Sequence, residues 1–123
     1  MRKILFFDPK IVEIGLDEIF KDLDLEILKA TSGDEAVSLL ESTPVSMVIS
    51  EMSSDGKWLL REVKGLDPQP PFVFLSSGPS GPSRYFKMGA QCCFPKTEEG
   101  LSLLKDFIDL WMKRDELYRK SWY

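Results

Sequence analysis

Four polar residues with the chemistry of a phosphate-handling site each stand at the end of a short apolar run. They are Asp8, Glu51, Ser76 and Lys96. The acids could orient a phosphoryl group together with a metal ion, the hydroxyl could donate a hydrogen bond to it, and the ammonium group could neutralise its charge. If the fold brings these side chains together, the sequence predicts a site that accommodates a phosphoryl group.

The apolar runs that precede these residues alternate with helical patterns. Strands are predicted over 3–8, 25–30, 45–50, 72–76 and 91–95, and helices over about 10–22, after Ser32, from Asp55, over about 83–88 and from Glu98 nearly to the end. Short connections in this order indicate right-handed crossovers and a doubly wound α/β fold, with one parallel sheet covered on both faces. Ligands of such folds bind beyond the carboxyl ends of the strands, where the four residues should meet.

Local signals predict where two of the helices begin. Ser32 can cap the helix that follows it, and Glu35, three positions later, completes a capping box. Asp55, which Gly56 follows, is interpreted as the N-cap of the next helix. The prolines of the segment 67–71 end that helix before the fourth strand.

The order and spacing of five segments resemble a known family, the CheY-like receiver domains of response regulators. The segments are ILFFD at 4–8, ATSGDEAVSLLE at 30–41, PVSMVIS at 44–50, DGKWLLREVKGLDPQPPFVFLSS at 55–77 and MGAQCCFPK at 88–96. The resemblance implies a flavodoxin-like (βα)5 fold with strand order 2-1-3-4-5, here with an extended C-terminal helix. It also implies a receiver-like domain over 1–112, and a helix extension or linker over 113–123.

The resemblance assigns roles to the four polar residues, and two positions depart from the family pattern. Asp8 matches the first of two paired acids, but Pro9 stands where the second would be. Glu51 occupies the position of the phosphorylated aspartate, and Lys96 matches the lysine of the family. The chain therefore resembles a pseudo-receiver, a receiver with a degenerate phosphoacceptor site.

The switch positions and the neighbouring loops depart from the family as well. Ser76 matches the switch hydroxyl, whereas Cys93 stands where a mobile aromatic residue is usual. Thr97 replaces the proline that usually follows the lysine. The loop between Glu51 and the next helix is shorter than in the family, so the whole rim of the pocket is altered.

These departures predict weak magnesium binding and little phosphoryl transfer. Mg²⁺ demands near-octahedral oxygen geometry, and with Pro9 in place Asp8 is a weak candidate ligand, so no cofactor is expected. Without the ion, transfer to an anionic acceptor would push negative charges together. Glu51 is instead expected to pair with Lys96, either imitating the phosphorylated state or having no effect on signalling.

Two functions of different kinds are consistent with this pocket. The first is a non-enzymatic signalling module, phosphorylation-deficient, that acts through protein–protein contacts with a sensor-kinase-like partner or an output domain. The alternative is a working phosphoacceptor in a phosphorelay, through Glu51, or through Asp55 if the shortened loop folds it into the crevice. A flavodoxin-like protein that binds a nucleotide or flavin is disfavoured because no phosphate-binding loop follows the strands.

The predicted C-terminal helix carries apolar pairs that repeat every seven residues. The pairs are Leu103 and Leu104, Leu110 and Trp111, and Leu117 and Tyr118. One side of the helix should pack on the sheet. The later aromatic residues Tyr118, Trp122 and Tyr123 could line a parallel homodimer, begin a linker to an output domain, or fold back on the domain.

Composition excludes several other functions. The chain has 123 residues and a formal charge of −4, which argues against a nucleic-acid-binding surface. It has no histidine, so Ser-His-Asp catalysis is excluded, and the adjacent Cys92 and Cys93 provide too few ligands for a structural zinc site. No apolar run is long enough for a membrane span. We therefore expect a cytoplasmic protein.

Overall fold

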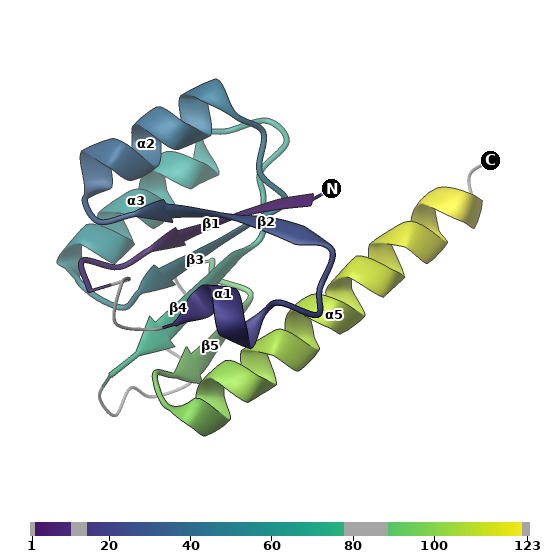
Figure 1. Ribbon diagram of the computed structural model, residues 1–123. Coiled ribbons are helices and arrows are strands. Elements are labelled where there is room, and N and C mark those ends of the chain that lie inside the picture. Colours follow the sequence, from purple (N-terminus) through teal and green to yellow (C-terminus); the bar gives the residue numbers. More distant parts are fainter. Residues whose placement is uncertain (1, 11–14, 78–88, 122–123) are drawn as a thin grey trace.

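The chain folds as one parallel sheet between two layers of helices. The computed structural model describes residues 2–10, 15–77 and 89–121, with the backbone alone described over 115–121. Helices α2 and α3 cover one face of the sheet, and α1 and α5 cover the other (Figure 1). The elements are β1 (Arg2–Phe7), α1 (Leu16–Ile19), β2 (Leu25–Ala30), α2 (Gly33–Ser42), β3 (Met47–Glu51), α3 (Ser54–Lys64), β4 (Phe72–Ser76), β5 (Cys92–Pro95) and α5 (Glu98–Ser121).

The strands form one sheet in the order β2-β1-β3-β4-β5, and every neighbouring pair is parallel. The predicted doubly wound, flavodoxin-like fold and its strand order are therefore confirmed. Central strands that are buried on both faces read as continuous apolar runs, as the sequences of β1, β3 and β4 do. The helix predicted over about 83–88 lies outside the described residues.

Two apolar clusters hold the helices on the sheet, one on each face. On the first face, Leu16 and Phe20 of the α1 region pack with Leu104 and Ile108 of α5. On the second face, Ala36 of α2 packs with the apolar side of α3. Since side chains alternate between the faces of a strand, neighbouring residues of each central strand contribute to different clusters.

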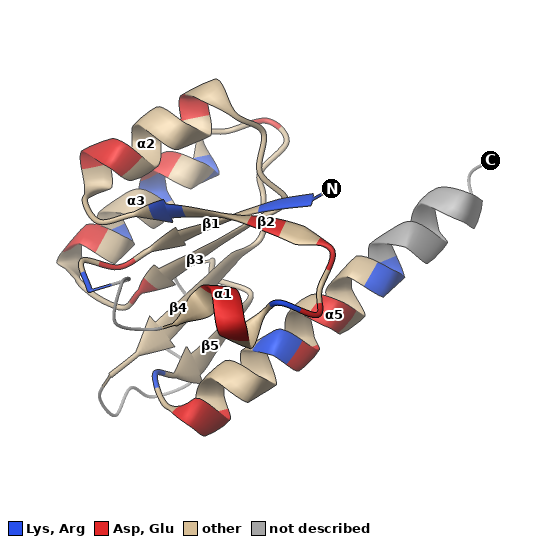
Figure 2. Ribbon diagram, in the orientation of Figure 1, with Lys and Arg blue, Asp and Glu red and all other residues tan. Residues whose placement is uncertain are grey.

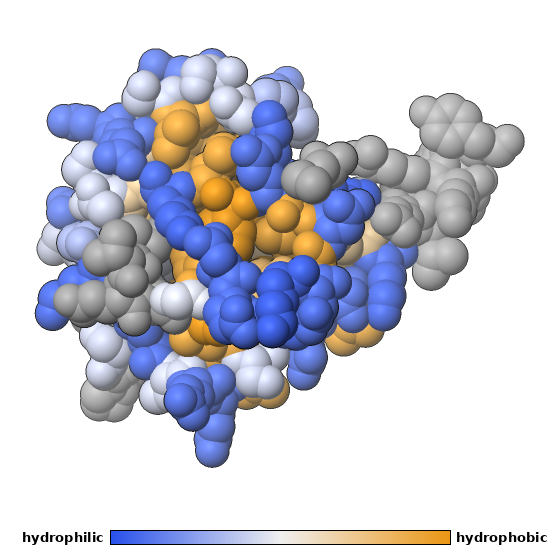
Figure 3. All heavy atoms as spheres, in the orientation of Figure 1, coloured by the Kyte–Doolittle hydropathy of each residue, from blue (hydrophilic) through white to orange (hydrophobic). Residues whose placement is uncertain are grey.

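The side of the sheet at the edge strand β2 has an exposed apolar surface, and charged side chains lie along this strand. Figure 3 shows apolar surface on this side of the molecule, between α2 and α5, crossed by hydrophilic side chains. Lys29 Nζ lies 2.8 Å from Asp17 Oδ2, and Lys3 Nζ lies 3.9 Å from Glu26 Oε2. Charged side chains on an edge strand disfavour pairing with a strand of another chain.

Serine residues cap α2 and α3. Ser32 Oγ accepts a hydrogen bond of 3.2 Å from the backbone N–H of Glu35, which confirms the predicted cap. Within the described residues the Glu35 carboxylate makes no return bond to Ser32, so the predicted capping box is incomplete. Ser53 Oγ accepts one of 3.1 Å from the backbone N–H of Gly56, so Ser53 is the N-cap of α3. The prediction that Asp55 caps this helix was wrong, because the helix begins two residues earlier and Asp55 lies in its first turn.

Helix α1 is shorter than the sequence predicted. Gly15 precedes it in the left-handed region, with φ of 70°, a conformation that glycine adopts at little cost. Lys10, the predicted start, lies instead in a turn, where its backbone N–H donates a hydrogen bond of 2.8 Å to Asp8 Oδ1. Apolar spacing alone did not reveal this interruption, and residues 11–14 lie outside the described part.

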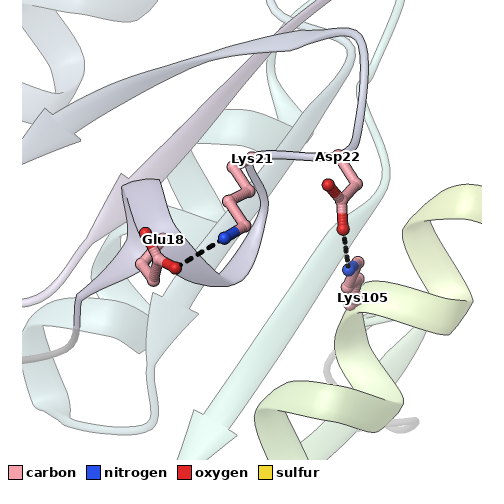
Figure 4. A network of polar contacts seen from close by, with 4 residues as sticks. All are labelled: Glu18, Lys21, Asp22 and Lys105. Atoms are coloured by element: carbon pink, nitrogen blue, oxygen red, sulfur yellow. Dashed lines mark hydrogen bonds and ion pairs between the residues drawn. The ribbon is translucent and has the colours of Figure 1, made fainter.

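Helix α5 packs on the sheet with its first half and runs past the sheet with its second half (Figure 1). Lys105 Nζ lies 3.3 Å from Asp22 Oδ2 in the segment before β2, and Lys21 Nζ lies 2.7 Å from Glu18 Oε1 nearby (Figure 4). The Arg2 guanidinium lies 5.7 Å from the centre of the Trp111 ring.

Within the described ranges, no helix combines the length and apolar character needed to cross a bilayer.

Candidate functional site

The four polar residues lie at one edge of the sheet. In the strand register, Phe7 of β1 lies beside Ser50 of β3, Glu51 lies beside Leu75 of β4, and Ser76 lies beside Pro95 of β5. Asp8 and Lys96 directly follow β1 and β5, while Glu51 and Ser76 are the last residues of β3 and β4. The backbone therefore starts all four side chains from the carboxyl ends of the strands.

Asp8, which is buried, and Lys96, which is partly buried, form an ion pair at this edge. Lys96 Nζ contacts Asp8 Oδ2, and the side chains are 21% and 2% exposed, respectively. The other carboxylate oxygen of Asp8 accepts the hydrogen bond from the backbone N–H of Lys10. Oδ2 is buried, and its contact with the Lys96 ammonium group compensates its charge. Removing one member of such a pair leaves a buried charge uncompensated.

The segment around Lys96 is positioned by its neighbours on both sides. The backbone N–H of Lys96 donates a hydrogen bond of 2.8 Å to the carbonyl oxygen of Ser76. Thr97 accepts a hydrogen bond of 3.0 Å at Oγ1 from the backbone N–H of Gly100. A Cβ atom at Gly100 would lie 1.7 Å from the Pro95 carbonyl oxygen, so the first turn of α5 needs glycine there.

Glu51 does not pair with Lys96, and the expected ion pair between them was wrong. The Glu51 side chain is partly buried, and within the described residues its carboxylate makes no ion pair or hydrogen bond. The physical reason is the difference in burial between the two acids. Asp8 has no access to water and needs the ammonium group, whereas a partly exposed carboxylate keeps part of its hydration.

The connection between β3 and α3 is short and tightly packed. Only Met52 and Ser53 separate the two elements. A Cβ atom at Gly56 would lie 2.1 Å from the Glu51 carbonyl oxygen and 2.7 Å from Ser50 Oγ. The first turn of α3 therefore lies directly against the end of β3, and only glycine fits at this contact.

Asp55, the alternative acceptor, faces a different part of the surface. It is exposed and lines a hollow of about 380 Å³ between the starts of α2 and α3. The other residues of this hollow are Ser32, Gly33, Asp34 and Trp58. Asp55 makes no ion pair with Lys96 in the described part of the chain.

The hollow contains a contact that the sequence reasoning missed. A Cβ atom at Gly33 would lie 2.9 Å from Cζ3 of Trp58, so the indole ring lies directly on the start of α2. The ring is nevertheless 39% exposed. A glycine directly after the N-cap Ser32 was the only signal in the sequence, and it does not say which residue approaches it.

The two switch positions lie on adjacent strands. Ser76 is half-buried at the end of β4, and Cys93 is half-buried in β5, opposite Phe74. Cys93 packs against the apolar cluster on the α2 and α3 side of the sheet. Their roles in switching stay predictions.

The residues present do not fit the magnesium ion that the receiver fold implies. In the part of the chain that the structure describes, no three acidic, cysteine or histidine side chains group as metal ligands would. Lys96 contacts one oxygen of Asp8 and a backbone N–H contacts the other. Pro9, beside Asp8, offers no carboxylate. A divalent ion would have to displace an ammonium group to reach the buried oxygen.

No protein-family model and no curated protein sequence matches this chain. Solved structures do match it. A response regulator receiver domain protein from Clostridium thermocellum is 21% identical with a TM-score of 0.79, over 96% of this chain and 99% of that one. A two-component response regulator from Clostridium difficile is 18% identical with a TM-score of 0.81, over 93% and 98% of the two chains.

A further match is to a chain in the structure of the P1 domain of CheA3 in complex with CheY6 from R. sphaeroides. It is 21% identical with a TM-score of 0.73, over 91% of this chain and 97% of that chain. At such identities the likeness establishes the fold. The chain has the flavodoxin-like fold of response-regulator receiver domains along nearly its whole length.

Proposed function

We propose that this chain is a signal-transduction domain of the receiver type that is phosphorylation-deficient and acts through contacts with other proteins. It is not an enzyme in this proposal. The observation that carries it is the ion pair between the partly buried Lys96 and the buried Asp8. This pair uses the cation and the first acid that phosphoryl transfer at such a site would require.

Charge is the physical basis of the proposal. A phosphoryl donor and an acceptor carboxylate are both anionic, so their approach needs positive charge at the transferring group. Lys96 is held by Asp8, and the residues around it do not fit a divalent ion. Glu51 would then meet the donor without a neighbouring cation, and its transfer barrier should be high.

A module that takes no phosphoryl group can still act by its surface. The match to a complex between the P1 domain of CheA3 and CheY6 supports a protein partner, and we propose a sensor-kinase-like protein or an output domain. We also propose a cytoplasmic location, a receiver-like unit over 1–112 and a role for 113–123 as a helical extension or linker. Interspersed charges of both signs over α2, α3 and α5 (Figure 2) favour a protein partner over a nucleic acid.

The test is incubation of the full chain with a small acyl-phosphate donor and Mg²⁺, followed by intact-mass measurement. A receiver domain that accepts phosphate serves as the positive control under the same conditions. The proposal predicts no phosphoryl adduct on this chain while the control is modified.

The same assay, applied to two variants, tests the alternative function, which is a working phosphoacceptor in a phosphorelay. If an Mg²⁺-dependent adduct forms, the variants Glu51→Gln and Asp55→Asn identify the acceptor. If the adduct is lost in one variant and persists in the other, the residue replaced in the first variant is the acceptor. That result would overturn the proposal.

A further inference from the structure

The outer face of α5 carries two exposed leucines. Leu103 and Leu110 are 54% and 66% exposed, whereas Leu101, Leu104 and Ile108 on the other side of the helix are buried. Residues seven positions apart lie on the same side of a helix, and apolar residues at this spacing are typical of a helix that packs against another helix. We propose that this face pairs with the same face of a second copy of the chain, with the two α5 helices antiparallel.

Charges beside the two leucines favour a second copy of the chain as the partner and an antiparallel direction of the two helices. Glu99 precedes Leu103 by four residues, and Arg114 follows Leu110 by four residues. Both charged side chains are exposed, and neither forms an ion pair or hydrogen bond within the described structure. A register that places Leu103 against Leu110 of the second copy therefore also places Glu99 against Arg114 of the second copy.

The charge distribution along α5 distinguishes antiparallel from parallel pairing. The helix begins with the acidic Glu98 and Glu99, and the last two residues whose side chains are described, Lys113 and Arg114, are basic (Figure 2). A parallel pair would oppose Glu99 to Glu99, Asp106 to Asp106 and Arg114 to Arg114, and like charges repel. Of these three like-charge contacts, the antiparallel pair keeps the Asp106 repulsion, near its centre, and it gains two ion pairs between Glu99 and Arg114.

The domain leaves this face of the helix accessible. The buried side of α5 and the ion pair between Lys105 and Asp22 fix the rotation of the helix on the sheet. Leu103 and Leu110 consequently point away from the core. Because the second half of α5 runs past the sheet (Figure 1), there is room for the first turns of a second α5 beside it.

The interface in this proposal is small, so the dimer should be weak and reversible. Sedimentation equilibrium of the full chain over a range of concentrations should show a monomer–dimer equilibrium. The variant Leu110→Asp should shift the chain to monomer at all concentrations. Ser102→Asp is the matched control, because it adds the same charge on the same helix about a quarter turn away and should leave the equilibrium unchanged.

Charge exchange tests the direction of the helices. The single variants Glu99→Arg and Arg114→Glu should each raise the dissociation constant roughly fivefold, and the double variant should return it to within about twofold of the native value. Glu41→Arg on α2 is the control for a charge reversal elsewhere. A double variant that binds as weakly as the singles, or a native chain that stays monomeric, would overturn the proposal.

A cross-link can locate the contact directly. In the variant Arg114→Lys, a carbodiimide should join the Glu99 carboxyl of one copy to the new amine at position 114 of the other, with loss of water. Within one helix these positions are roughly 22 Å apart, too far for a direct amide bond. Peptide mapping should find this link in the dimer, and a dimer that lacks it, or whose links join position 99 to other lysines only, would contradict the register.

Discussion

Lys96 pairs with Asp8, at the end of β1, and not with Glu51, at the end of β3. In the sheet, β3 and β4 lie between β1 and β5, so the ion pair joins segments that follow two strands that are not neighbours. An internal ion pair therefore lies at the edge of the sheet where the four polar residues begin. The one unpaired acid of these four, within the described residues, is the one at the acceptor position.

Replacing the lysine should destabilise the fold. Lys96→Met leaves the buried Asp8 carboxylate without its counter-charge, and the free energy of unfolding should fall by about 3 kcal/mol. Urea denaturation measures this change. The matched control is Lys105→Met, which breaks the largely exposed pair with Asp22 and should cost less than about 1 kcal/mol.

The double variant Asp8→Asn with Lys96→Met separates the ion pair from packing. It removes both charges, so the loss of stability should be smaller than in Lys96→Met alone. Equal losses in the single and double variants would show that the charge of Asp8 does not depend on the lysine.

Glu51 should contribute little to stability. Its carboxylate makes no described ion pair or hydrogen bond, so Glu51→Gln should change the free energy of unfolding by no more than about 0.5 kcal/mol. Chemical denaturation beside the native chain gives the answer. A loss of several times that size would indicate that Glu51, rather than Asp8, holds the lysine in solution.

The contact between α3 and the end of β3 should not tolerate a methyl group. Gly56→Ala would place a Cβ atom 2.1 Å from the Glu51 carbonyl oxygen, and we expect a loss of about 2 to 3 kcal/mol from the forced backbone shift. Gly65→Ala is the control, since its nearest atom, the Glu62 carbonyl oxygen, lies at 3.5 Å. Thermal melts that are equally shifted in both variants would refute this close packing.

Alanine substitutions at Ser53 and Asp55 can test which residue caps α3. Ser53→Ala removes the oxygen that accepts from the N–H of Gly56, and it should cost about 1 kcal/mol. Asp55→Ala removes a charge from the first turn and should cost about half as much. The opposite order of the two losses in urea denaturation would restore Asp55 as the cap.

The sheet was predictable because its signal is local. Strands buried on both faces appear as short apolar runs, and their alternation with helical patterns allows few topologies. The polar residues that follow the runs could be assigned to one edge for the same reason. The sequence therefore predicts the shared position of Asp8, Glu51, Ser76 and Lys96 at this edge.

The partner of Lys96 was not predictable, because it depends on how deeply each acid is buried. The sequence does not reveal how exposed Asp8 and Glu51 are. Which of the two acids pairs with Lys96 depends on their burial in the folded structure. Two predictions of local structure, the N-cap of α3 and the start of α1, were wrong for a similar reason. Ser53 and Asp55 are both good capping residues, and only the end of β3 decides between them. Gly15, in the left-handed region, directly precedes α1, at a point where the apolar spacing looked continuous.

The most direct test of the proposed phosphorylation deficiency is an amide NMR titration of the full chain with Mg²⁺ and beryllofluoride, a small analogue of the phosphoryl group. The account predicts no saturable shifts at Asp8, Glu51, Ser76 or Lys96, because the ammonium group of Lys96 is already held by Asp8. Saturable shifts centred on these residues, with an affinity that depends on Mg²⁺, would contradict it.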